Sequence, residues 1–216
     1  MTKTQRFKIP EVATLGQTDQ AIAHLRTYFG LNGHAAYTGA HFERLGGGGD
    51  RVEARDVLCA DDLIAVRMLS VDVNASAALQ LLEDKSAQIT DLLSLIPADV
   101  ELVDAPDDFF EAESAARRLW RLFNDEPGIG WVTAGKLLAR KRPRLIPVFD
   151  SVVRASVGGG ASYWKPLAKA LAADGMRLQD HLGCLRSVSG IGEDISIIRA
   201  FDVIVWMDGR EQSRAA

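Results

Sequence analysis

The chain has 216 residues, of which 47% are hydrophobic and 25% charged, a composition typical of a globular protein with a sizeable core. Its net charge of −4 excludes a protein that is basic over its whole surface, so a nucleic-acid site would have to be a local basic patch. The two cysteines, Cys59 and Cys184, are too few and too far apart for a disulfide framework or a cysteine-ligated metal site.

The sequence shows neither a signal-peptide pattern nor an apolar run of about 18 residues. We therefore expect a cytoplasmic protein, a monomer, with no membrane partner. Only four histidines are present, and none forms a convincing metal pair. We expect no metal and no other cofactor.

The first part of the chain, residues 1–58, is expected to form an N-terminal helix, a loop and a glycine-rich linker. Residues 1–17 are polar and read as an arm outside the core. The four consecutive glycines Gly46–Gly49 predict a flexible linker. A phosphate-cradling loop is the alternative, but no strand precedes these glycines and no Gly-Lys-Ser/Thr follows them.

Apolar residues recur at helical spacing along the chain, and convincing alternating strand patterns are absent. The pattern predicts an all-α helical bundle, with residues 59–216 as one compact core. The expected helices span Thr18–Phe29, Leu63–Leu69, Asn74–Leu82, Ala87–Leu95, Pro106–Phe123, Val132–Arg142, a segment from Asp150 to the glycines at 158–160, segments through Leu171 and near Leu178–Leu182, and Asp194–Met207.

The most informative stretch runs from Pro127 to Lys136 and predicts a helix-hairpin-helix. Gly128 and Gly130 allow backbone angles that a Cβ would forbid, and Ile129 between them can anchor the turn in the core. The first N–H groups of the following helix lack partners within that helix and, together with the helix dipole, favour an anion. The alternative is an ordinary corner between two helices.

The helix after the turn is rich in cations. We expect Gly128, Gly130 and Thr133 to seat one phosphate. The cations expected to clamp a DNA backbone beside it are Lys136, Arg140 and Arg142. Trp131 and Trp164 are candidate walls of a base pocket, although aromatic side chains are more often core residues.

Two segments together resemble the helix-hairpin-helix DNA glycosylase superfamily, which includes endonuclease III and MutY. They are Pro127-Gly128-Ile129-Gly130 with Thr133-Ala134, and Pro147-Val148-Phe149-Asp150 twenty residues after Gly130. The apolar segment at 62–70 is similar to the helix that opens the six-helix barrel of that family, and 201–210 is similar to its late core helix. The same residues also resemble an uncharacterised actinobacterial family, which implies no activity.

The glycosylase resemblance implies that Asp150 is the catalytic carboxylate, which would stabilise positive charge on the sugar after the base is flipped out of the duplex. A purely structural role as a helix N-cap is the alternative. Val132 occupies the position of the Schiff-base lysine of bifunctional members, so no amine-based strand cleavage is expected. The cysteine cluster that holds iron–sulfur in several members is missing.

The sequence therefore predicts a DNA-binding, N-glycosidase-like protein that excises a damaged or modified base. The alternative is a non-catalytic helix-hairpin-helix protein that binds DNA or acts as a scaffold. A third class, motivated by the acidic net charge, is a small-molecule or protein-interaction protein that keeps the helical core without DNA binding.

Overall fold

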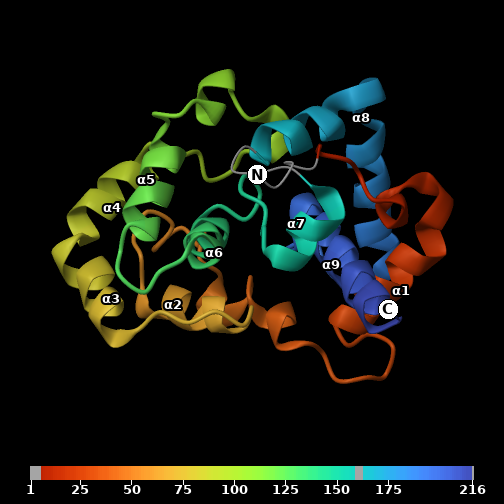
Figure 1. The fold of residues 1–216 in the computed structure, drawn as a ribbon, viewed down its shortest axis with the longest axis horizontal. Helices are drawn as coiled ribbons and strands as arrows, with labels where there is room; N and C mark the ends of the chain where they lie inside the picture. Colours follow the sequence, from red (N-terminus) through yellow and green to blue (C-terminus); the bar gives the residue numbers. More distant parts are fainter. Residues whose placement is uncertain (1–5, 159–162, 216) are drawn as a thin grey trace. The chain divides into compact units, whose positions relative to one another are not determined.

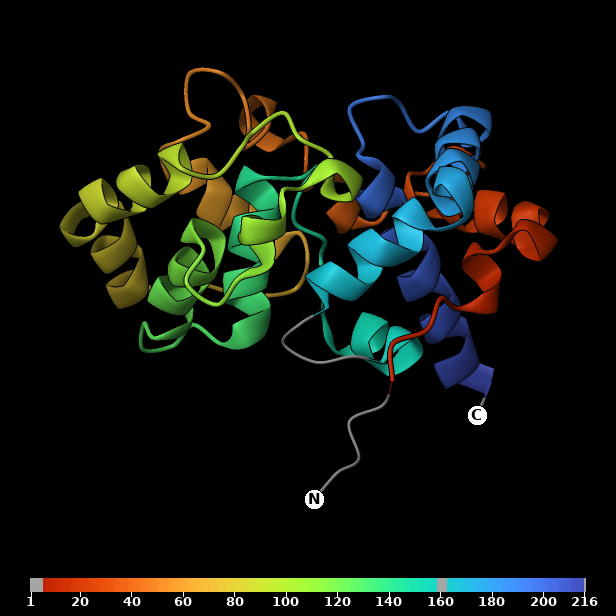
Figure 2. The same ribbon diagram turned by 90° about the horizontal axis from the view of Figure 1, so that it is seen from above.

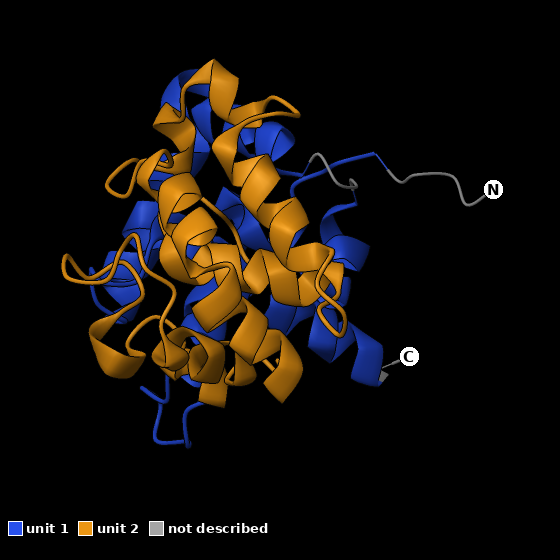
Figure 3. Cartoon of the chain, turned by 90° about the vertical axis from the view of Figure 1, so that its left-hand side faces the viewer, with its two compact units in different colours: residues 1–37, 149–216 blue, residues 38–148 orange. Residues whose placement is uncertain are grey.

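The computed structural model describes residues 6–158 and 163–215, and the regular elements within these ranges are all helical. The all-α prediction is thereby confirmed. The chain divides into two compact units, coloured separately in Figure 3. Unit 1 comprises Met1–Tyr37 and Phe149–Ala216, and unit 2 comprises Thr38–Val148.

The α-helices of unit 1 are α1 (Thr18–Tyr28), α7 (Ser151–Val157), α8 (Trp164–Ser189) and α9 (Ile197–Ala215). Those of unit 2 are α2 (Ala60–Arg67), α3 (Ala75–Leu79), α4 (Ser86–Ser94), α5 (Ala115–Asn124) and α6 (Trp131–Lys141). A π-helical segment, Gln80–Asp84, joins α3 to the stretch before α4, and short 3-10 helices occupy several connections.

Helix α9 is the central element of unit 1 and packs against α1, α7 and α8 (Figure 1). Its apolar side chains Ile198, Phe201 and Val205 are buried, as expected for a helix surrounded by neighbours. Gly209 permits α7 to come close, because a Cβ there would lie 2.9 Å from both Ser156 Oγ and Val152 Cγ1. This close packing of α7 on α9 shapes the polar cavity of unit 1.

Helix α6 is the central element of unit 2 and packs against α2 and α5, while α4 packs against α5 (Figure 2). Ala134, Leu137 and Leu138 of α6 are fully buried. The small Ala134 lets a neighbouring helix approach, and the leucines fill the space around it. The turn with the two predicted glycines joins α5 to α6.

Most expected helices are present with small shifts at their ends, but the one from Pro106 is not continuous. Asp107–Phe110 is a 3-10 helix, and α5 begins only after Ser114, whose side chain accepts a hydrogen bond from Arg117 N–H. A serine cap of this kind starts a new helix and overrides the first-turn preference of Pro106. In α8 the backbone leaves helical angles at 173–176, where Asp174, Gly175 and Met176 have positive φ.

The unit boundaries differ from the predicted division at residues 58 and 59, because 6–37 belong with the C-terminal helices. Residues 6–17 are not simply an arm, since Val12 and Ala13 are buried in unit 1. Nor is the glycine run a linker between units. Gly48 and Gly49 are buried inside unit 2, and a Cβ on Gly49 would collide with the backbone of Arg140.

None of the helices between residues 6–158 and 163–215 combines the length and apolar character that a membrane crossing requires.

Candidate functional site

The turn between α5 and α6 is exposed and tightly built. Gly128 has φ +89°, and a Cβ on it would collide with the side-chain amide of Asn74. The Asn74 amide donates to Pro127 O (3.3 Å) while its oxygen accepts from Ala77 N–H (2.9 Å), so Asn74 fixes the turn and caps α3. Ile129 is buried, which confirms its predicted anchoring position.

Helix α6 begins at this turn without a side-chain cap on Gly130, and a Cβ on Gly130 would meet open space. Its first backbone bond within the helix runs from Ala134 N–H to Gly130 O (3.0 Å). Thr133 is 7% exposed, so its side chain contributes little surface to the predicted phosphate seat.

The cations of the predicted backbone clamp are buried. Lys136, Arg140 and Arg142 are 3%, 1% and 0% exposed, and Lys141 between them is fully buried. Since a phosphate contact needs the charged end of the side chain at the surface, these cations cannot hold a DNA backbone in this structure. Lys136 instead donates to Leu69 O (2.7 Å), which ties the end of the α2 segment to α6.

The buried cations hold unit 2 together. Arg140 donates to Asp62 (3.0 Å) and to the carbonyls of Phe42 and Glu43, while Lys141 donates to Asp62 (3.1 Å) and to Ala54 O (2.8 Å). Backbone carbonyls and a buried carboxylate thus replace the water that these charges lose.

Arg142 extends this network to other segments of unit 2. It donates to Ile96 O (2.9 Å) and to the Asp56 carboxylate (2.6 Å). Burial lowers the pKa of Arg142, and the hydrogen bond to Asp56 acts in the opposite direction. Burial likewise lowers the pKa of Lys141, against the attraction of Asp62.

Asp150, the predicted catalytic carboxylate, caps α7. Its Oδ1 accepts from Val152 N–H (2.9 Å) and Val153 N–H (3.0 Å), an N-cap arrangement that satisfies two otherwise unpaired amides. The side chain is partly exposed. Asp150 belongs to unit 1, whereas the turn belongs to unit 2.

The two predicted base-pocket tryptophans differ in exposure. Trp131 is 36% exposed at the start of α6. Trp164 is only 6% exposed at the start of α8, so its ring is a core residue and is not open to a base. The stacked aromatic pairs of unit 1 include Phe149 on Tyr163, with ring centroids 4.2 Å apart, and Tyr28 on Tyr37, 5.3 Å apart.

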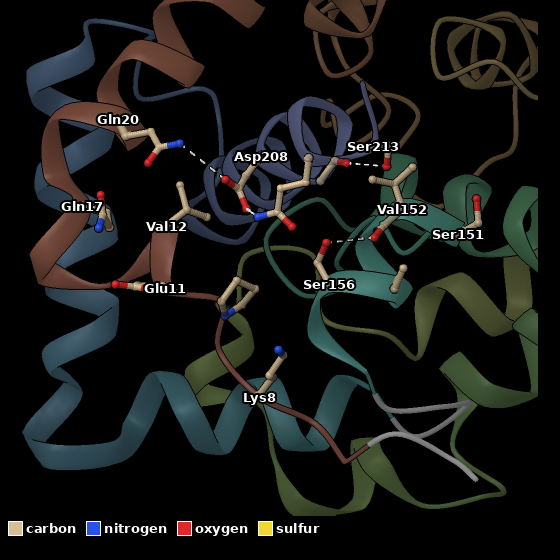
Figure 4. Close-up of a pocket in the computed structure, with 14 residues that line it drawn as sticks. Lys8, Glu11, Val12, Gln17, Gln20, Ser151, Val152, Ser156, Asp208 and Ser213 are labelled. Carbon is tan, nitrogen blue, oxygen red and sulfur yellow. Dashed lines mark hydrogen bonds between the residues drawn. The ribbon is translucent and has the colours of Figure 1, made fainter. Parts of the chain in front are cut away.

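Unit 1 contains a polar cavity of about 810 Å³, which we call the unit 1 pocket (Figure 4). This volume is in the range of small-molecule sites. The wall is formed by the N-terminal segment, α1, α7 and α9. The residues that line it are Lys8, Pro10, Glu11, Val12, Gln17, Gln20, Ser151, Val152, Ala155, Ser156, Asp208, Gly209, Gln212 and Ser213.

Asp208 is the central polar group of this pocket. Its Oδ1 accepts from the Gln20 amide (3.5 Å) and its Oδ2 accepts from the Gln212 amide (2.7 Å), as Figure 4 shows. Burial raises the pKa of Asp208, the neighbouring His24 lowers it, and Glu211 raises it again. A partly buried carboxylate held by two neutral amides keeps its negative charge largely uncompensated.

Sequence reasoning missed this pocket because its residues are far apart in the chain and belong to no motif. Lys8 and Gln20 come from one end of the chain, and Asp208 and Gln212 from the other. One signal was available: Asp208 and Gly209 follow a long apolar run, where an acid and a glycine mark a break in the buried face.

Unit 2 has a smaller cavity of about 450 Å³ beside α4 and α5. Three of its five charged side chains, Lys85, Glu113 and Arg121, are paired. Arg121 makes two hydrogen bonds to Glu113 (2.9 and 3.0 Å), and Lys85 pairs with Glu126 (2.5 Å). Side chains whose charges are already paired gain little from binding a charged ligand.

The fold and sites define an all-helical protein of two compact units, with a polar pocket in unit 1 and a buried cation network in unit 2. A family model described as a family of unknown function, DUF6308, matches residues 21–209, and the chain belongs to this family. Comparisons with curated proteins and with solved structures found no match.

Proposed function

We propose that the protein binds a small polar molecule in the unit 1 pocket. The observation that carries this proposal is the Asp208 carboxylate, which lies on the wall of an 810 Å³ cavity and is oriented by Gln20 and Gln212. Such oriented polar groups in a concave site are what specific small-molecule recognition requires. The proposal develops the third class of function that the acidic composition suggested.

The experiment is a thermal-unfolding screen of the full chain against small metabolites grouped by charge. A ligand that binds only the folded state raises Tm, and the shift grows with its concentration. We expect at least one group to raise Tm for the wild type but not for Asp208→Asn. The matched control is Asp19→Asn, because Asp19 is exposed on α1 and does not line the pocket. No shift from any group, or equal shifts in both variants, would contradict the proposal.

Binding to DNA with excision of a base is a second candidate function, favoured by the exposed turn at 127–131. The α6 N-terminus has no side-chain cap, and Gly130 leaves room for a backbone to approach. Asp150 uses only Oδ1 in its two capping bonds, so its second oxygen could still act on a substrate. Against this candidate, acidic residues outnumber basic ones in unit 2, and the cations of α6 are buried.

Two measurements test this second candidate. Release of a base from a panel of damaged duplexes, lost in Asp150→Asn, would support the N-glycosidase. Binding without release, weakening steeply as salt increases, would support the non-catalytic alternative. Absence of both would leave the small-molecule proposal as the function of the chain.

A further inference from the structure

The unit 1 pocket presents opposite charges on different sides. Lys8 comes from the N-terminal segment and Asp208 from α9, and Figure 4 shows them on different sides of the cavity. Lys8 is anchored through its backbone, since its N–H donates to Val157 O (2.8 Å), but no ion pair joins its side chain to a described residue. The pocket therefore offers a cation and an anion that do not neutralise each other.

Asp208 is suited to an ammonium group. Both of its hydrogen-bonding partners, Gln20 and Gln212, are neutral amides, so no cation among the described residues hydrogen-bonds the carboxylate. His24 is the nearest basic neighbour on α1, and burial lowers the pKa of His24, which favours the neutral ring. A charged N–H donor to a partly buried carboxylate forms one of the stronger hydrogen bonds available in proteins.

The other acidic side chains near the pocket do not provide a second position for the ammonium group beside Asp208. Glu11 also lines the pocket, but Figure 4 shows its carboxylate pointing away from Asp208. Glu211 lies next to His24 (3.9 Å) with its side chain 61% exposed, and it is not part of the pocket lining. Of the two acids that line the pocket, Asp208 is the one held by the Gln20 and Gln212 amides.

Besides the charged side chains of Lys8, Glu11 and Asp208, apolar groups form part of the wall. Pro10 and Val12 line the pocket from the N-terminal segment and are buried, and Val152 and Ala155 line it from α7. Apolar contacts of this kind favour an aliphatic body in a ligand, because its methylene groups leave water on binding.

We infer that the ligand of the unit 1 pocket is a small aliphatic zwitterion, with its ammonium group at Asp208 and its anionic group at Lys8. This inference rests on the proposed function and names the chemistry of that same site. It requires both charged ends, so removing either end of the ligand or either side chain of the protein has a separate, predictable consequence.

The test is calorimetric titration of the full chain with three matched probes: 6-aminohexanoate, hexylamine and hexanoate. Glycine and 4-aminobutanoate vary the distance between the charges. We expect the zwitterion of the best length to bind about tenfold more tightly than the probe that lacks either charge, the usual effect of losing one charge-assisted contact.

Variants assign each end of the ligand. Asp208→Asn should remove the advantage of the zwitterion over hexanoate, and Lys8→Met should remove its advantage over hexylamine. The controls are Asp19→Asn and Lys169→Met, two charge removals in exposed unit 1 residues outside the pocket lining, which should leave all affinities unchanged.

Two results would overturn the inference, and they can be told apart. If hexylamine or a neutral polyol such as glucose bound as tightly as the zwitterion, and Asp208→Asn abolished that binding, the pocket would be functional but the zwitterion would be wrong. If no probe bound and the metabolite screen also gave no Tm shift, the proposed function itself would fail.

Discussion

The cation cluster of unit 2 and the pocket of unit 1 differ in where their charged side chains lie. In unit 2 the charged ends of Arg140, Lys141 and Arg142 point inward and are saturated by carbonyls and carboxylates of the same unit. In unit 1 Asp208 lies on a cavity wall and Lys8 remains at the surface. The comparison shows that a dense cluster of cations in a sequence can be structural, while a few scattered polar residues can form the site.

The largest effect is expected from breaking the unit 2 network. Arg140→Met removes the guanidinium but leaves buried Asp62 and the carbonyls it served, which should lower the free energy of unfolding by about 3–5 kcal/mol. Denaturant titration followed by circular dichroism measures the change. Arg118→Met, an exposed position on α5, is the matched control and should cost under about 0.5 kcal/mol. Equal stability of the two variants would show that the network is not structural.

A smaller effect is expected at the turn. Gly128→Ala places a Cβ at φ +89° against Asn74, which should cost about 1–2 kcal/mol from the backbone alone. Gly130→Ala is the matched control, because its φ is −90° and its Cβ would meet open space. Denaturant titration of both variants compares them directly, and a Gly130→Ala variant as unstable as Gly128→Ala would contradict the described turn.

The smallest effect is expected on the free energy of unfolding at acidic pH. Burial lowers the pKa of His24 from its ordinary value of 6.5, so the folded state disfavours the charged ring. The free energy of unfolding therefore has its full value above pH 6.5, where the ring is neutral in both states. It decreases as the pH falls from 6.5 through the pKa of the folded state. Unfolding titrations from pH 7.5 downward should show this loss, and His24→Leu should flatten it. An identical acid profile in the variant would assign the loss to other groups.

Much of the fold was predictable from the sequence because helical periodicity and caps are local. Helix α1, the glycine turn and the buried Ile129 follow from spacing and backbone preference alone. The helix expected from Pro106 was not continuous, because Ser114 caps a separate α5. A local sequence pattern cannot decide between two competing helix start positions.

The site was far less predictable, because burial depends on distant segments. The direction of Arg140 is set by Asp62 and by the carbonyls at 42–45, which lie more than 75 positions away in the chain. The position of Asp208 on a cavity depends on the N-terminal segment folding onto α9. The run of basic residues on α6 resembled a surface patch because the sequence alone does not show the buried groups that pair with them.

The most direct measurement is a ¹H–¹⁵N correlation spectrum of the full chain, recorded with and without 6-aminohexanoate. We predict shifts of the side-chain amides of Gln20 and Gln212 and of backbone amides around the pocket, with the amides of 128–134 unmoved. Unchanged Gln20 and Gln212 signals at saturating probe, together with shifts at 128–134 on addition of duplex DNA, would contradict the account.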